Sequence, residues 1–458
     1  MIEKLDSGIS RRRLFRNFAL LVGAAPLLSQ EQKVNMVVRS VRPRDLEMPL
    51  DGFGTWITPV ERFFVRTHVY EPQIDVESWK LRIDGEVETP LTLTLDDLRQ
   101  LPKAEVVGVL ECAGNGRSFF EPTVIGMQWT HGGVGNGRWA GARLGDVLKK
   151  AGIKSSAKHI LFDGADVPIG TMPDFTRTVP LKKSLDPSTL LAYEMNGQPL
   201  PAAHGFPLRV VAPGWAGDSW VKWITHIQAL DREHDGFFMK TAYRYPVRPV
   251  APGEAVDAAN LSPVEALRPK SVIASPVENA RLPNGPVRIQ GAAWSGESPI
   301  VKVEVSTDSG RTWRAAQLGP DRAKYAWRLW EARWSPPGPG SYLLMARATD
   351  ASGQTQPFAQ DWNPSGYLWN VVAQTRVEVG GSGAVAKAPE AGKIPPFPDS
   401  AKASCIGCHE ADIIAGQRLT RAQWEREVNK MVGWGAKVKP EDRSALLDFL
   451  TGNFGPRR

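Results

Sequence analysis

The sequence predicts three folds in succession: a mixed α+β region, an all-β sandwich and a small all-α region at the C-terminus. At 458 residues the chain is too long for one ordinary hydrophobic core. Its 37 prolines and 43 glycines favour strands and loops over long helices. The residue pattern also changes near residue 271 and again near residue 400, so we expect domain boundaries at both places.

The net charge of +7 comes from basic residues that are scattered along the chain rather than gathered into blocks. A nucleic-acid partner is therefore not expected. A mildly positive field instead suits an anionic substrate or an acidic protein partner. The three cysteines, Cys112, Cys405 and Cys408, allow one disulfide bridge at most, which excludes a disulfide framework.

Residues 1–30 have the pattern of an export signal. Arg11-Arg12-Arg13 precedes an apolar run over residues 18–28, and paired arginines before a short apolar stretch are typical of twin-arginine signals. The run is too short to span a bilayer comfortably. We therefore expect a periplasmic protein that is exported in the folded state, with a frayed basic helix as the alternative.

Residues 34–248 mix short strands with short helices, which predicts an α+β domain. Residues 79–85 and 208–212 have the alternation or the apolar run of strands. Thr94 is followed by acidic residues in a first helical turn and is expected to cap a short helix. Residues 139–151 predict a second helix with one apolar face.

Cys112 stands where a predicted buried strand, residues 106–110, runs into a turn-prone stretch. That stretch is rich in glycine and asparagine over residues 113–116, and the cation Arg117 follows it. A thiolate delivered into such a turn can hold a soft metal. A buried cysteine that acts as a small apolar residue is an equally open alternative at this point.

The rest of the chain divides into four segments. Residues 249–270 are rich in proline and alanine and predict a linker. Residues 271–379 contain short alternating strands at the spacing of an immunoglobulin-like sandwich. Residues 380–400 begin with Gly-Gly-Ser-Gly and predict a flexible tether, after which residues 401–458 are helical in pattern.

Cys405, Cys408 and His409 form the pattern C-x-x-C-H, the attachment signature of c-type haem. The two thiols would bond the haem edge and His409 would ligate the iron. A zinc site would need a fourth donor, and the sequence after His409 contains neither cysteine nor histidine. Met431 is the only methionine after His409 and is the candidate second iron ligand. We therefore expect residues 401–458 to be a cytochrome c domain.

Three further motifs occur in order and carry a family resemblance: Cys-Ala-Gly-Asn at 112–115, Ala-Tyr-Glu-Met-Asn-Gly at 192–197 and His-Gly-Phe-Pro at 204–207. Together they closely resemble the sulfite oxidase family of molybdenum enzymes, over about residues 48–379. The resemblance implies a molybdopterin-binding α+β domain followed by an immunoglobulin-like dimerisation domain. A homodimer formed through that second domain is expected on the same ground.

The resemblance also implies roles for individual residues. Cys112 matches the thiolate that ligates molybdenum beside the dithiolene of the pterin. Arg66 and Arg117 match basic residues that flank an oxyanion pocket, and Tyr193 matches the active-site tyrosine. The residues that match positions binding the pterin and its phosphate are His68, His204, Arg209 and Lys222.

These matches predict a sulfite dehydrogenase that passes electrons through its own haem c to an external cytochrome c. Gly116 and the segment 362–367 resemble bacterial sulfite dehydrogenases more closely than eukaryotic sulfite oxidases. They also resemble the molybdenum subunit of sulfane dehydrogenase, which acts on carrier-bound sulfur. Oxidation of carrier-bound sulfane sulfur is therefore the alternative function. A third hypothesis, a non-catalytic electron-transfer module without molybdenum, is disfavoured by the intact Cys112.

Overall fold

The structure is a computed structural model that describes residues 35–380, 394–406 and 409–456. The chain divides into two compact units, Met1–Asn35 and Met36–Arg458, and every element described below belongs to the second. The predicted export signal, residues 381–393 of the predicted tether, and Cys408 lie outside the described residues.

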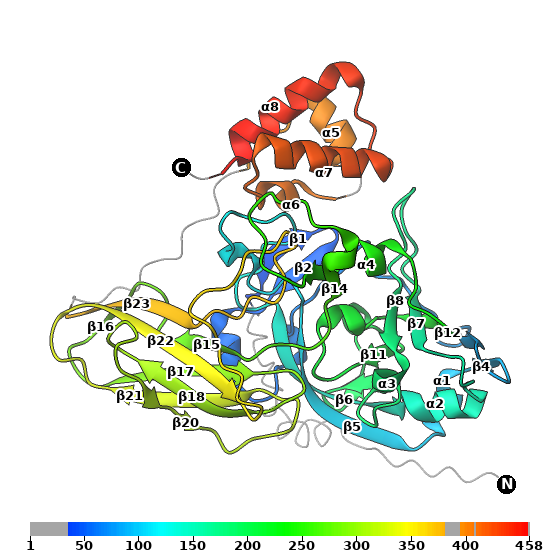
Figure 1. The fold of residues 1–458 in the computed structure, drawn as a ribbon, viewed down its shortest axis with the longest axis horizontal. Helices are drawn as coiled ribbons and strands as arrows, with labels where there is room; N and C mark the ends of the chain where they lie inside the picture. Colours follow the sequence, from blue (N-terminus) through cyan, green and yellow to red (C-terminus); the bar gives the residue numbers. More distant parts are fainter. Residues whose placement is uncertain (1–34, 381–393, 407–408, 457–458) are drawn as a thin grey trace, which may run out of the picture. The chain divides into compact units, whose positions relative to one another are not determined.

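Two five-stranded sheets form the first domain, in agreement with the α+β prediction (Figure 1). One sheet has the order β10-β9-β6-β5, and β11 also pairs with β9; all of its pairs are antiparallel. Its strands are β5 (Lys103–Glu111), β6 (Val134–Arg143), β9 (Leu190–Met195), β10 (Gln198–Pro199) and β11 (Arg209–Val211). This sheet delivers Cys112, the residue after β5.

The other sheet has the order β4-β3-β12-β7-β8, with one parallel pair, between β3 and β12. Its strands are β3 (Leu81–Gly85), β4 (Leu91–Leu93), β7 (His159–Gly164), β8 (Arg177–Pro180) and β12 (Ile224–Leu230). A short pair, β1 (Val37–Val41) and β2 (Arg44–Glu47), precedes both sheets. One apolar core with Leu81, Trp139 and Ile227 fully buried joins the two sheets.

Four short helices accompany these sheets: α1 (Leu95–Arg99), α2 (Leu144–Ala151), α3 (Leu181–Ser184) and α4 (Phe237–Lys240). Thr94 caps α1 as predicted, because its hydroxyl accepts from the backbone N–H of Asp97 while the Asp97 side chain bonds back to it. The predicted helix over 139–151 is wrong in its first part. Residues 139–143 belong to β6, where pairing with β5 and β9 outweighs the helical pattern.

Two packed sheets form the second domain, as predicted for residues 271–379 (Figure 1). The four-stranded sheet contains β15 (Lys270–Ser275), β17 (Val287–Trp294), β20 (Gln317–Leu318) and β21 (Arg328–Trp334). The five-stranded sheet contains β16 (Ala280–Leu282), β18 (Ile300–Ser306), β19 (Arg314–Ala315), β22 (Gly340–Asp350) and β23 (Ala373–Val379). Their inward-facing residues share a core that includes Ile289, Val303 and Leu344.

The segment predicted as a linker is partly structured. Its strand β14 (Leu261–Pro263) pairs with β13 (Arg244–Pro246) in an antiparallel ladder. Val264 is fully buried, and its backbone N–H donates to the carbonyl of Tyr243. Proline and alanine content therefore did not identify an unstructured linker here, because the backbone of residues 261–264 is hydrogen-bonded to residues 243–246.

The C-terminal segment is helical, as the sequence predicts, with α5 (Asp399–Cys405), α6 (Ala411–Ala415), α7 (Arg421–Gly433) and α8 (Arg443–Phe454) (Figure 1). These helices enclose their own apolar core, in which Leu419, Trp424 and Leu450 are buried. Across residues 35–380, 394–406 and 409–456, no helix combines the length and the hydropathy that a membrane crossing requires.

Candidate active site

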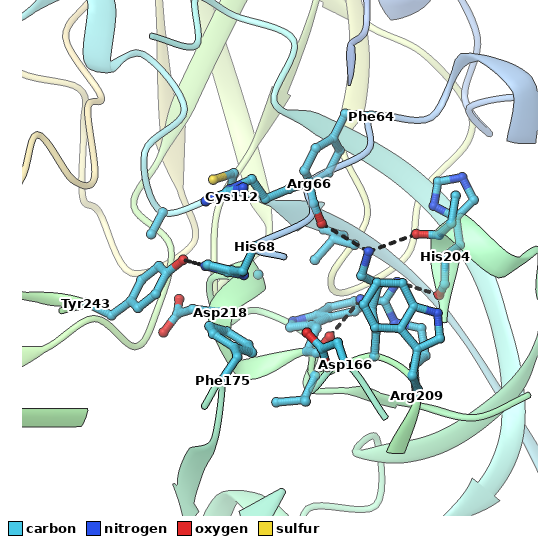
Figure 2. A pocket seen from close by; sticks show the side chains of 18 residues that line it. Phe64, Arg66, His68, Cys112, Asp166, Phe175, His204, Arg209, Asp218 and Tyr243 are labelled. Atoms are coloured by element: carbon cyan, nitrogen blue, oxygen red, sulfur yellow. Dashed lines mark hydrogen bonds between the residues drawn. The ribbon is translucent and has the colours of Figure 1, made fainter. Parts of the chain in front are cut away.

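A cavity in the first domain collects six of the residues that the sequence singled out (Figure 2). They are Arg66, His68, Cys112, His204, Arg209 and Lys222. The remaining wall is largely apolar or aromatic and includes Phe64, Phe175, Trp220 and Trp223. Residues up to 156 positions apart in the chain, Arg66 and Lys222, thus meet around one thiol, which favours the metal-ligand alternative for Cys112.

Backbone hydrogen bonds fix the turn that holds Cys112. Its N–H donates to the carbonyl of Gly133 at 2.9 Å, and its own carbonyl accepts from the N–H of Asn115 at 2.8 Å. Gly116 has a φ of +94°, which a side chain would make costly. The glycine-rich stretch is therefore needed for the turn that presents the thiol to the cavity.

The second domain also holds this turn, through a buried network that the sequence did not predict. Glu111 accepts from the ammonium of Lys270 at 2.8 Å and from the indole N–H of Trp294 at 2.7 Å. The Lys270 ammonium also donates to the carbonyl of Asn115 at 3.0 Å, and the Asn115 amide donates to Glu111 at 2.9 Å. Residues on both sides of Cys112 are thereby tied to strands β15 and β17.

Burial raises the pKa of the Cys112 thiol, while Arg117 and Arg66 oppose that shift. Arg117 does not line the cavity wall. Its guanidinium donates to the carbonyls of Ser365 at 3.0 Å and Met127 at 2.9 Å and lies 5.2 Å from the ring centre of Tyr367. Arg66 lines the wall and forms an ion pair with Asp45 at 3.1 Å. A metal ion would replace the thiol proton at this place.

Lys222, Arg209 and His204 make a second part of the wall cationic or rich in donors. Burial lowers the pKa of Lys222 to about 7, that of Arg209 to about 9 and that of His204 to about 3. Lys222 donates to the carbonyls of Arg66 and Ala203, at 3.0 and 2.9 Å, and Arg209 to those of His204 and Trp220. Within the described residues, neither cation has a carboxylate at ion-pair distance, so this end of the cavity favours an anion.

Tyr193, the predicted active-site tyrosine, does not line the cavity that contains Cys112. It belongs to β9, its ring lies 5.9 Å from the Arg99 guanidinium, and it is not among the lining residues that the structure describes. The tyrosine of the wall is Tyr243, whose hydroxyl is 2.7 Å from Nε2 of His68. No local pattern distinguishes Tyr243 in the sequence, because it reaches the cavity only through the tertiary fold.

Comparisons with known proteins agree with this architecture. Residues 68–238 match the family described as oxidoreductase molybdopterin binding domain, and residues 262–380 match the Mo-co oxidoreductase dimerisation domain. The chain is 36% identical over 348 residues to sulfite oxidase of Gallus gallus, covering 72% of this chain and 75% of that protein. This chain belongs to the sulfite oxidase family.

Other relatives extend the range of the family. Mitochondrial sulfite oxidase of Drosophila melanogaster is 36% identical over 374 residues, which are 77% of this chain; the chain spans 65% of the length of that relative. The NADH nitrate reductase of Ulva prolifera is 33% identical over 355 residues, 70% of this chain and 40% of that protein. The sulfane dehydrogenase SoxCD of Paracoccus pantotrophus has a similar structure, with a TM-score of 0.67 and 27% identity over 80% of this chain and 96% of that one.

The wall residues fit the molybdopterin cofactor of the sulfite oxidase family. A molybdenum–molybdopterin group needs a thiolate, cations for its phosphate and a largely apolar slot, and the cavity offers Cys112, then Lys222 and Arg209, then an aromatic wall. Lys222 and Arg209 lie in this wall with no described carboxylate at ion-pair distance, and burial lowers the pKa of both. An anionic occupant would supply the missing counter-charge.

A second cavity has Cys405, His409 and Met431 in its wall, together with apolar residues such as Ile414 and Leu450. Burial raises the pKa of the Cys405 thiol to about 11. Arg66 and His68 line this cavity as well as the first. Three of the four residues predicted for haem are thus together, and the fourth, Cys408, lies outside the described residues.

Proposed function

We propose that this chain oxidises sulfite to sulfate with a molybdenum–molybdopterin cofactor held through Cys112. Water supplies the oxygen atom, and two electrons and two protons are released. The observation that carries the proposal is the buried thiol of Cys112 in one cavity with Arg66, Lys222 and Arg209. When bound, the cofactor supplies oxygen-atom transfer and accepts the two electrons.

The residues around the thiol have separate tasks. Arg66, oriented by Asp45, presents a guanidinium to an oxyanion. Arg117, behind the wall, adds positive charge beside the thiol and favours its anionic form. Tyr243 offers its hydroxyl beside His68, and burial keeps that imidazole neutral by lowering its pKa.

We further propose that residues 401–458 are a cytochrome c domain and that an external cytochrome c is the electron acceptor. The convergence of Cys405, His409 and Met431 on one apolar-walled cavity supports this. The two thiols of Cys405 and Cys408 would attach the haem, with His409 and Met431 as iron ligands. When bound, the haem supplies single-electron transfer.

The proposal also includes the cellular location and the oligomeric state of the protein. A twin-arginine signal in residues 1–30 would export the folded chain to the periplasm, where covalent haem attachment takes place in bacteria. The match of residues 262–380 to a dimerisation domain supports a homodimer formed through the second domain.

Carrier-bound sulfane sulfur is the second candidate substrate. It is favoured by the structural likeness to the sulfane dehydrogenase SoxCD, which covers 80% of this chain. One experiment separates the candidates: metal and pterin analysis of the purified chain, followed by addition of sulfite or of a persulfidated carrier protein. Reduction of the haem spectrum by sulfite supports the first candidate. Reduction by the carrier alone selects the second, and a chain without molybdenum contradicts both.

A further inference from the structure

Asp218 is a carboxylate in the wall of the Cys112 cavity that the proposed reaction does not use (Figure 2). Its side chain is fully buried. Oδ2 accepts from the Arg177 guanidinium at 2.6 Å, whereas Oδ1 has no hydrogen-bond partner among the described residues. A buried acceptor without a donor is costly, so its presence in a cofactor cavity indicates that the occupant brings a donor.

Arg177 fixes the direction of this free oxygen. Its guanidinium also donates to the carbonyl of Phe238 and lies 5.2 Å from the ring centre of Tyr243. Arg177 is itself buried, so the ion pair cannot turn toward solvent. Oδ2 is held by the arginine, and the buried Oδ1 is left without a donor among the described residues.

Different residues of the wall suit different parts of the cofactor. Lys222 and Arg209 offer donors and positive charge, which suit the phosphate of molybdopterin. The pterin ring carries an amide N–H and an amino group, and these donors need an acceptor. Among the described residues, two carboxylates line this wall, Asp218 and Asp166. The charge of Lys222 acts on Asp166 and lowers its pKa, against the larger upward effect of burial.

We propose that Oδ1 of Asp218 accepts a hydrogen bond from the N–H edge of the pterin ring and so anchors the cofactor at the end opposite its phosphate. The inference rests on the proposed function in taking molybdopterin to occupy the cavity. Aromatic neighbours fit a planar heterocycle there: Phe175 and Trp220 line the same wall.

Asp218→Asn tests the anchor with almost no change in shape. Arg177 requires an acceptor, so the Asn oxygen turns toward it and the amide N–H₂ faces the pterin donors. A matched control is Glu297→Gln, which changes another ion-paired carboxylate, 2.8 Å from Lys183, outside the cavity wall. Should Asp218→Asn fail to fold, the double change Asp218→Leu with Arg177→Met removes the acceptor and the buried charges together.

The readout is the rate at which purified, cofactor-loaded protein releases pterin on dilution, measured as the fluorescent oxidised pterin, with molybdenum by elemental analysis. Asp218→Asn is expected to release pterin about tenfold faster than the parent, in line with loss of one charge-assisted hydrogen bond. Glu297→Gln is expected to match the parent.

The increase in melting temperature on cofactor loading should be smaller in Asp218→Asn than in the parent and unchanged in Glu297→Gln. Because each variant is compared with its own cofactor-free form, any effect of the substitution on the cofactor-free fold cancels. Release at the parent rate from both Asp218→Asn and the double variant overturns the anchor, as does a loaded structure with only water at Oδ1. A parent without pterin would instead contradict the proposed function itself, so the two failures are distinguishable.

Discussion

The hydroxyl of Tyr243 lies 2.7 Å from Nε2 of His68, and both residues line the cavity that contains Cys112. The Tyr243 ring is fixed by stacking on Tyr367, with 5.4 Å between ring centres and 7° between planes. Burial raises the pKa of Tyr243 and lowers that of His68, so at neutral pH the pair is a protonated phenol beside a neutral imidazole. This pair can hold or pass one proton beside the thiol.

Tyr243→Phe is expected to lower the rate of sulfite-dependent haem reduction by about 10- to 100-fold, because it removes the only hydroxyl of this pair. Stopped-flow absorbance of the haem measures the rate. Tyr193→Phe is the control and is expected to keep the parent rate, since Tyr193 is not in the cavity wall that the structure describes. The opposite result for the two variants would return the active-site role to Tyr193.

Cys112→Ser is expected to abolish turnover and to leave the chain with little molybdenum, because a hydroxyl is a poor substitute for a thiolate ligand. Its haem content should equal that of the parent, since Cys405 and His409 belong to a different cavity. Elemental analysis and the haem absorbance check both statements. Oxidation of sulfite at the parent rate would show that Cys112 does not hold the metal.

The sequence alone was sufficient to predict site residues that belong to short contiguous motifs. Cys112, His204, Arg209 and Lys222 each stand in or near a local motif, and the fold brings them to one cavity. The change from mixed to alternating pattern likewise placed the β-sandwich near residue 271, where β15 begins at Lys270.

Tertiary contacts decide what the sequence could not show. Tyr243, Asp218 and Lys270 come from separate segments of the chain and have no motif, so only the folded chain reveals that they meet around the Cys112 turn. Residues 139–143 have a helical pattern, yet pairing with β5 on one side and β9 on the other makes them part of β6. Local propensity is weaker than a ladder of hydrogen bonds in a buried sheet.

Lys222 gives the cofactor-free protein a predictable pH dependence. Burial lowers its pKa to about 7 from an ordinary value of 10.5, so between these values the unfolded chain binds a proton that the folded chain does not. Stability therefore rises with pH from 7 toward 10 through this group. Lys222→Met should remove that rise, which is at most about 1.4 kcal/mol per pH unit.

Urea unfolding of the cofactor-free parent and of Lys222→Met at pH 7 and pH 9 measures the effect, because the comparison cancels the other titrating groups. Between pH 7 and pH 9 the free energy of unfolding of the parent is expected to increase relative to that of Lys222→Met. An equal difference at both pH values would mean that Lys222 keeps its proton in the fold.

Lys270→Met tests whether the second domain holds the Cys112 turn. The variant leaves the Glu111 carboxylate buried without its cation, and loss of one partner of a buried ion pair costs about 3–5 kcal/mol. The melting temperature should fall, and molybdenum content should fall with it because the turn between Glu111 and Asn115 loosens.

Two further variants separate charge from packing at this position. Lys270→Arg keeps the cation and should lose less stability than Lys270→Met. Adding Glu111→Gln to Lys270→Met removes the stranded charge and should recover part of the melting temperature, since the amide oxygen can still accept from Trp294. Recovery of stability without recovery of molybdenum would show that Lys270 fixes the position of the turn in addition to neutralising Glu111. Full molybdenum content in Lys270→Met would instead show that the first domain alone determines the geometry of Cys112.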